Sequence, residues 1–258
     1  FYRNLLTPYT HQYASGCGRF DILPLVVFYY LYAEDAMIWP RRPDGTVSFK
    51  LEDLNKANNW VEGRAHEAMI DVEVTVVLAK LMRLNRPMWD YLMGYYDKQI
   101  DQDRIQKLMQ QPNPFQGVGL MTGLRFGSRL GYQCPVLHIG GHHLFKNQRV
   151  FLRLDQPIES LDETVLSKLV VKKKLGEPCF VLPYSSKYTD RLSEALQDQV
   201  KQNLLFLSHH EHQQQLQQCR HQSASFTEHV DLDASLYHAG FLSKEEQSWC
   251  EQFHLAQG

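Results

Sequence analysis

The sequence predicts an α+β chain of more than one domain, and three observations lead to this prediction. Residues 1–95 carry apolar runs with the spacing of buried or amphipathic helices. After about residue 96 the pattern changes to short β-prone runs separated by Gly, Asn and His. With 258 residues, the chain has room for one large domain or two small ones.

The first 95 residues predict three helices and a loop. Residues 21–32 are apolar with Pro24 near their start, which indicates a buried helix that begins at or just before that proline. Residues 39–50 are rich in Pro, Gly and charge, and predict a loop. Ser48 is placed to cap a short helix that follows. The helix expected over 68–83 is apolar around most of its circumference, which indicates burial on most sides.

The rest of the chain predicts a small barrel or sheet followed by helices. Strands are expected over 118–126, 132–139, 149–154 and 179–183, and helices over 160–168 and 190–206. The polar stretch 209–222 contains four histidines but no matching carboxylate pattern. We therefore expect it to be a helical tail or linker, and not a metal site.

Composition excludes several classes of protein. The five cysteines are widely spaced without a C-x-x-C, so neither a disulfide framework nor a zinc knuckle is expected, and a reducing cytoplasm fits best. The longest apolar run has 12 residues, whereas a membrane-spanning helix needs ~20. The amino terminus shows no signal-peptide pattern and no starting Met, so we expect a chain that begins inside a longer protein.

Charge is distributed unevenly around a net value of −2. Residues 96–180 carry 12 Lys and Arg against 8 Asp and Glu, a net charge of +4, whereas the flanking stretches are net acidic. This middle part is the only stretch whose charge favours a polyanion, although ordinary scatter would also produce it.

One pair of residues suggests chemistry. His66 and Asp71 flank the start of the apolar helix predicted over 68–83. The ordinary interpretation is a hydrogen-bonded histidine at a helix start and an acid in the first turn. However, an unpaired carboxylate on a buried helix is costly, and a hard divalent cation is a natural partner for it. His66 would then be able to reach a water molecule held by that metal.

This segment resembles the third sequence motif of the DEDD 3′→5′ exonucleases, in the subtype that carries a histidine. Within that superfamily it looks most like the bacterial exodeoxyribonuclease I family. The supporting residues are Phe1-Tyr2-Arg3-Asn4, Arg19-Phe20-Asp21, Trp39-Pro40, Asp44-Gly45, Ser48-Phe49, Lys50-Leu51, Leu54, Ala57-Asn58, Ala68, Thr75, Val230-Asp231, Leu236-Tyr237 and Gly240-Phe241.

The resemblance implies a Mg²⁺-dependent exonuclease that degrades single-stranded DNA to 5′-mononucleotides in DNA repair and recombination. Such enzymes hold two Mg²⁺ ions, which Mn²⁺ can replace, with four carboxylates. Asp71 matches the last of these carboxylates, and His66 matches the general base that takes a proton from the attacking water. The Asp-x-Glu of the first motif and the Asp of the second are missing from the expected places, so the resemblance implies an amino-terminally truncated fragment that is inactive by itself.

The resemblance also implies three domains and a set of DNA contacts. Residues 1–95 would be the carboxy-terminal portion of an RNase H-like α/β exonuclease domain, 96–225 an SH3-like β-barrel domain with helices, and 226–258 the start of a helical domain. Phe126 and Tyr132 would stack on bases or simply pack in the core. The side chains expected to follow phosphates are Arg125, Arg129, Lys146, Arg149, Lys172, Lys173 and Lys174.

Single-stranded DNA is the partner that the resemblance implies, with the acidic tail of single-strand DNA-binding protein as a second partner and no membrane. Two alternatives remain open. One is a DEDD exonuclease that acts on RNA, although the long chain after residue 95 argues against it. The other is a non-catalytic scaffold that binds single-stranded nucleic acid. For the lysine run 172–174, the alternative is a solvated face.

Overall fold

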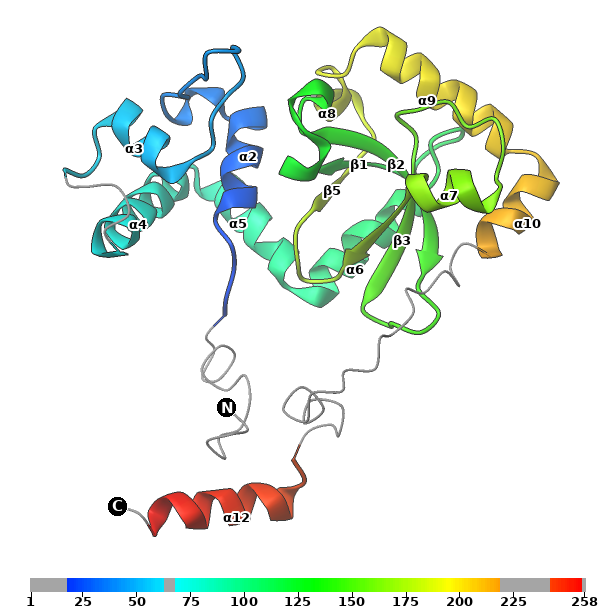
Figure 1. Cartoon of the computed structure of the whole chain (residues 1–258). Coiled ribbons are helices and arrows are strands. Elements are labelled where there is room, and N and C mark those ends of the chain that lie inside the picture. Colours follow the sequence, from blue (N-terminus) through cyan, green and yellow to red (C-terminus); the bar gives the residue numbers. More distant parts are fainter. Residues whose placement is uncertain (1–17, 63–67, 219–241, 257–258) are drawn as a thin grey trace. The chain divides into compact units, whose positions relative to one another are not determined.

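The computed structural model describes residues 18–62, 68–218 and 242–256 (Figure 1). Residues 21–222 form one compact unit, and the carboxy-terminal helix α12 (Lys244–Leu255) belongs to a second unit. The other helices are α2 (Leu23–Tyr32), α3 (Leu51–Asn58), α4 (Ala68–Leu84), α5 (Arg86–Met93), α6 (Lys98–Lys107), α7 (Glu163–Leu169), α8 (Ser186–Thr189), α9 (Glu194–Leu207) and α10 (His210–Gln218). The 3₁₀ turns are η3 (Glu34–Ala36), η4 (Gly94–Tyr96), η5 (Leu108–Gln110), η6 (Leu124–Phe126) and η7 (Ser128–Leu130).

Helix α2 confirms the predicted buried helix. It contains no charged residue, and Leu25, Val27 and Tyr29 are completely buried. Pro24 lies in the first turn, where its missing N–H is not needed by the helix. The Tyr29 hydroxyl donates to the carbonyl of Met82 at 2.5 Å, which ties α2 to the last turns of α4.

The predicted helix cap at Ser48 is wrong. Helix α3 begins at Leu51 with Lys50 as its N-cap residue and no side-chain cap. The Ser48 hydroxyl instead donates to the Asp53 carboxylate, and Ser48 itself is buried. The Ser48 oxygen also accepts from the N–H of Lys50 at 3.4 Å, one residue before the helix begins, so it does not cap the first turn.

The sheet has five antiparallel strands in the order β4-β3-β2-β1-β5. They are β1 (Val118–Thr122), β2 (Gln133–Gly141), β3 (Gln148–Arg153), β4 (Val170–Lys174) and β5 (Phe180–Pro183). The four predicted strands are present, although β1 ends at Thr122 because the chain turns at Gly123 into η6. The recorded pairings leave β4 and β5 as the edges of an open sheet.

Both faces of the sheet are covered. Along β3, Val150 and Leu152 pack with residues of α7, α9 and α10, whereas Phe151 between them packs with Ile105 of α6. Successive side chains of a strand point to opposite faces, so this alternation places helices on either side. The sheet is therefore buried in the manner of an α+β fold.

The helices before residue 95 share a hydrophobic core with one end of the sheet. Leu78 and Met82 of α4 belong to the same cluster as Leu120 of β1 and Phe180 of β5. The Tyr95 hydroxyl also donates to the carbonyl of Val181 at 2.7 Å. The division of this unit at residue 95 and the start of a third domain at 226 stay predictions.

Helix α12 begins with a capping box. The Glu246 N–H donates to the Ser243 hydroxyl at 3.2 Å, and the Ser243 N–H donates to the Glu246 carboxylate at 2.7 Å. Within the described parts of the chain, no helix is long and apolar enough to cross a membrane.

Candidate functional site

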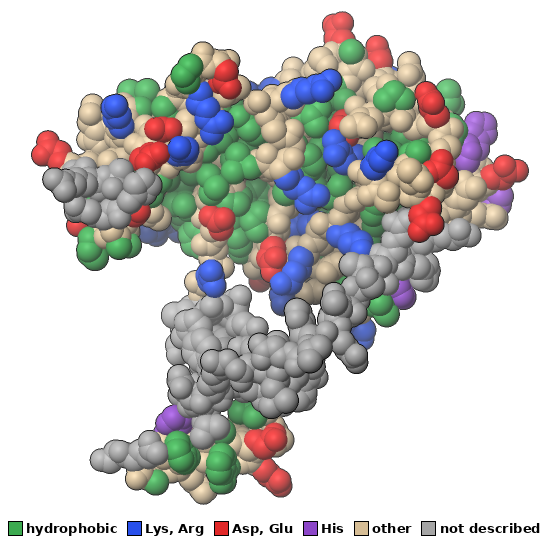
Figure 2. All heavy atoms as spheres, viewed as in Figure 1, with side chains coloured by type: hydrophobic (Ala, Val, Ile, Leu, Met, Phe, Trp, Pro, Cys, Tyr) green, Lys and Arg blue, Asp and Glu red, His purple; other side chains and the backbone are tan. Residues whose placement is uncertain are grey.

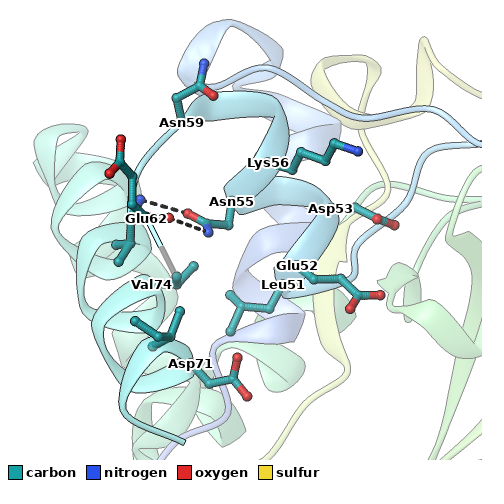
Figure 3. Close-up of a pocket in the computed structure, with 11 residues that line it drawn as sticks. Leu51, Glu52, Asp53, Asn55, Lys56, Asn59, Glu62, Asp71 and Val74 are labelled. Atoms are coloured by element: carbon teal, nitrogen blue, oxygen red, sulfur yellow. Dashed lines mark hydrogen bonds between the residues drawn. The ribbon is translucent and has the colours of Figure 1, made fainter. Parts of the chain in front are cut away.

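Asp71 lies in the first turn of α4 and lines a cavity of about 550 Å³ between α3 and α4 (Figure 3). Its side chain is half-buried, so the buried environment expected from the sequence is only partly present. The Thr75 hydroxyl donates to the Asp71 backbone carbonyl at 2.7 Å. His66 lies outside the described residues, so the arrangement of the two proposed functional groups is not part of the described geometry.

The cavity is acidic. Besides Asp71, its lining includes Glu52 and Asp53 of α3 and Glu62, which follows that helix. Figure 3 shows Asp71 at one end of the cavity and Glu62 toward the other, with Asn55 between α3 and the chain at Glu62. Sequence reasoning singled out Asp71 but not that Glu52 and Glu62 line the same cavity, because α3 and α4 meet only in the folded chain.

Two asparagines hold the wall of the cavity in place. Asn55 donates to the carbonyl of Val61 at 2.9 Å and accepts from the Val61 N–H at 3.0 Å. Asn58 makes the same reciprocal pair with the backbone of Ile38, with both distances 2.8 Å. Asn59 then ends the helix in the left-handed conformation, with φ 52°. The motif residue Asn58 thus has a structural role, since it fixes α3 to the preceding loop.

The described carboxylates do not by themselves fit a two-metal centre. Among residues 18–62, 68–218 and 242–256, no three His, Cys, Asp or Glu side chains converge in a way that would hold a metal ion. Two-metal phosphodiesterases require several carboxylates around ions about 4 Å apart. Asp71 supplies one such ligand, and Asp53 is already engaged by Ser48.

The predicted phosphate-contacting residues are placed on several elements of the larger unit. Arg125 lies in η6 and Arg129 in η7, both exposed, and Lys146 is exposed in the turn between β2 and β3. The predicted stacking residues Phe126 and Tyr132 are buried, with 7% and 8% exposure, as in the core-packing alternative. Figure 2 shows Lys and Arg side chains scattered over this face with Asp and Glu side chains among them.

Lys173 is not a surface lysine. Its ammonium nitrogen lies 2.6 Å from the Asp101 carboxylate and donates to the carbonyl of Glu177 at 2.7 Å, and the side chain is 1% exposed. Burial holds the pKa of Lys173 below its ordinary value, although the Asp101 carboxylate acts in the opposite direction. Its neighbours Lys172 and Lys174 point to the exposed side of β4. Lys173 is therefore not placed to contact a phosphate, and only Lys172 and Lys174 of the predicted run are exposed.

Two more of these cations have protein partners. Lys174 pairs with Glu177, and Arg149 donates to the Gln102 side chain at 2.6 Å and to the carbonyl of Lys146 at 2.8 Å. Burial lowers the pKa of Arg149. The predicted basic face is therefore partly neutralised by its own surroundings.

Comparison with known proteins gives consistent matches. The chain is 32% identical to exodeoxyribonuclease I of Buchnera aphidicola (Acyrthosiphon pisum) over 161 residues, which is 62% of this chain and 38% of that protein. It is 37% identical to exodeoxyribonuclease I of Haemophilus influenzae over 141 residues, which is 55% of this chain and 25% of that protein. No family model matches the chain.

A solved structure has the same fold. The match to Escherichia coli exonuclease I in complex with a dA16 oligonucleotide has a TM-score of 0.82 at 24% identity, and it covers 98% of this chain and 57% of that chain. At this identity the likeness establishes the fold alone. The chain thus matches well under two thirds of the length of each of these relatives.

Proposed function

We propose that this chain forms part of a metal-dependent 3′→5′ exonuclease acting on single-stranded DNA, because part of the chain is homologous to bacterial exodeoxyribonuclease I. The homology carries the proposal, and the position of Asp71 supports it: the carboxylate lines an acidic cavity at the start of α4. The products would be 5′-mononucleotides, and the single-strand DNA-binding protein tail is proposed as a second partner.

Within this proposal, Asp71 is one metal ligand and His66 is the general base. Mg²⁺ would supply charge stabilisation for the phosphodiester that is cleaved, and Mn²⁺ is the expected substitute. An imidazole titrates near pH ~6.5, which suits removal of a proton from water at neutral pH. The remaining carboxylates of such a centre are not among the described residues that surround Asp71.

The test is mononucleotide release from end-labelled single-stranded DNA by an active form of the protein that contains this chain. Asp71→Asn and His66→Ala should each lower the rate by at least ~100-fold. Asp71→Asn should in addition weaken Mn²⁺ binding measured by calorimetry. Glu73→Gln, an exposed neighbour on α4, is the control and should leave both values unchanged.

Near-wild-type turnover in the Asp71→Asn and His66→Ala variants would reject these roles. Preference for an RNA substrate of the same length would favour the RNA-trimming alternative. Single-strand binding without any metal-dependent cleavage would favour the scaffold alternative.

A further inference from the structure

The side chain of Asn55 on α3 is bonded to the backbone of Val61 by two hydrogen bonds (Figure 3, dashed lines). Its amide nitrogen donates to the Val61 carbonyl at 2.9 Å, and its oxygen accepts from the Val61 N–H at 3.0 Å. An asparagine amide carries a donor and an acceptor side by side, so it matches the N–H and C=O of one residue as a neighbouring strand would. Asn55 is not one of the residues that carry the family resemblance, and its role in the site has so far been only structural.

The helix that carries Asn55 is held in place by other residues. Leu54, beside it in α3, is 1% exposed and belongs to the main hydrophobic core. Asn58, one turn further along, is bonded to both backbone groups of Ile38. Trp60, which follows the helix, packs against the same core. Asn55 therefore projects from a fixed support, and through its two hydrogen bonds the backbone that follows the helix is fixed as well.

Val61 stands at one end of the segment that contains His66. Six residues, His66 among them, separate Val61 from Ala68, where α4 begins. Helix α4 holds the other end, because its Leu78 is packed in the core. A segment with both ends fixed has fewer conformations than one with a free end. The two hydrogen bonds of Asn55 therefore restrict the region that His66 can reach.

Asn55 is a poor candidate for a metal ligand, although it lines the same cavity as Asp71. Its amide oxygen already accepts from the Val61 N–H, and Mg²⁺ prefers carboxylates and water. Asp71, the proposed ligand, lies on a different helix from Asn55, which is bonded to Val61 and not to α4 among the described contacts. An effect of Asn55 on the reaction would therefore pass through the chain at Val61 and leave the metal site intact.

We propose that Asn55 is a positioning residue for the general base His66 and acts through the backbone of Val61. The inference rests on the proposed function, in which His66 takes a proton from the attacking water. That transfer requires the imidazole within hydrogen-bond reach of the water. A displacement of about 1 Å, even one caused far from the reacting atoms, can lower a rate by about 100-fold.

The first experiment is steady-state cleavage of single-stranded DNA by an active form of the protein that contains this chain. Asn55→Ala should lower kcat by about 10- to 100-fold and leave KM and the Mn²⁺ affinity unchanged. Asn58→Ala, which removes an equal pair of hydrogen bonds from the same helix, is the control and should lower kcat by less than about threefold. In a His66→Ala background, Asn55→Ala should cause no further loss, because two residues that act through one group are not additive.

The second experiment needs no activity. Amide hydrogen exchange of the 258-residue chain, followed by NMR, should show the Val61 N–H exchanging at least about tenfold faster in Asn55→Ala, with the amides of α4 unchanged. Asn55→Asp has almost the same volume and keeps the acceptor, but it places an oxygen opposite the Val61 carbonyl. Its kcat should therefore fall as in Asn55→Ala, and it replaces that variant if the alanine chain does not fold.

The outcomes separate this inference from the proposed function. If His66→Ala retains wild-type turnover, the role of His66 fails and the inference fails with it. If His66→Ala is slow but Asn55→Ala behaves like Asn58→Ala, only the role of Asn55 is overturned. An additive loss in the double variant would also overturn it, because Asn55 would then act on stability alone. A loss of Mn²⁺ affinity in Asn55→Ala would overturn it in favour of a role at the metal.

Discussion

The ammonium nitrogen of Lys173 lies 2.6 Å from the Asp101 carboxylate, and both side chains are buried, at 1% and 0% exposure. The same carboxylate oxygen accepts from the Gly176 N–H at 3.0 Å. The pair therefore fastens the edge strand β4 and its following turn to helix α6, across 72 positions in the sequence.

Lys173→Met should destabilise the chain strongly, because it leaves the Asp101 carboxylate buried without its counter-charge. Removing one partner of a buried pair costs about 3–5 kcal/mol. Urea unfolding followed by circular dichroism measures this loss. Lys172→Met, on the exposed side of the same strand, is the control and should change the free energy of unfolding by less than about 0.5 kcal/mol.

The double variant Asp101→Leu/Lys173→Met should recover most of the lost stability, because it removes both buried charges. A double variant as unstable as Lys173→Met would mean that the loss comes from packing, and not from the unpaired carboxylate.

Asp155 should make stability depend on acid pH. Burial opposes its ionisation, but hydrogen bonds from Arg153 at 2.8 and 2.6 Å and from the Cys134 thiol at 3.2 Å outweigh burial and lower the pKa of Asp155. A carboxyl group whose pKa is lowered by folding contributes stability above the unfolded value of ~3.9, and this contribution is lost as the pH falls through the folded value.

The free energy of unfolding, measured between neutral pH and about pH 3, should therefore fall less steeply in Asp155→Asn than in wild type, from a lower starting value. Asp198→Asn, which removes the exposed partner of Lys201, is the control and should follow the wild-type curve. An Asp155→Asn curve parallel to wild type would contradict this role of the Arg153 pair.

One face of α4 should promote self-association. Val72 and Val76 are 55% and 45% exposed, and Met69 is 67% exposed, whereas Leu78 on the same helix is 1% exposed. The burial on most sides that the sequence predicts for this helix is therefore wrong at the two valines and at Met69, whereas the core covers Leu78. Val72→Gln/Val76→Gln should shift sedimentation equilibrium toward the monomer with little loss of stability.

Leu78→Ala is the contrasting variant and should cost about 2–5 kcal/mol, because it opens a cavity in the core. Unchanged association in the valine variant would show that this face does not contact a second copy.

The exposed lysines of β4 provide a separate test of DNA binding. Lys172→Glu/Lys174→Glu should weaken binding to a single strand and flatten its salt dependence if these side chains follow phosphates. Lys168→Glu/Lys201→Glu, at exposed positions on α7 and α9, introduces the same charge change elsewhere and is the control. An effect no larger than that of the control would show that these lysines form a solvated face and do not contact the DNA.

Local patterns predicted helices α2, α3, α4, α7 and α9 and most of the strands, whereas α5, α6, α8 and α12 were missed. The apolar runs that became α2, α4 and α9 carry their signal in consecutive residues, because a buried helix needs apolar side chains every three or four positions. Strands β1, β2, β3 and β5 were likewise recognised from β-prone residues between turn residues. The homology to bacterial exodeoxyribonuclease I was also recognisable from the sequence, since motif residues such as Asp71 keep their order along the chain.

Tertiary structure decided where each charge lies. Strand β4 was missed because three of its five residues are lysines, and it exists because β3 and α6 supply hydrogen bonds and the buried Asp101. Ser48 turned from an expected cap into a partner of Asp53, and Glu52 and Glu62 came to line the same cavity as Asp71 only when α3 met α4. Burial, ion pairing and groove formation depend on residues distant in sequence, so hydrophobic periodicity and short motifs contain no information about them.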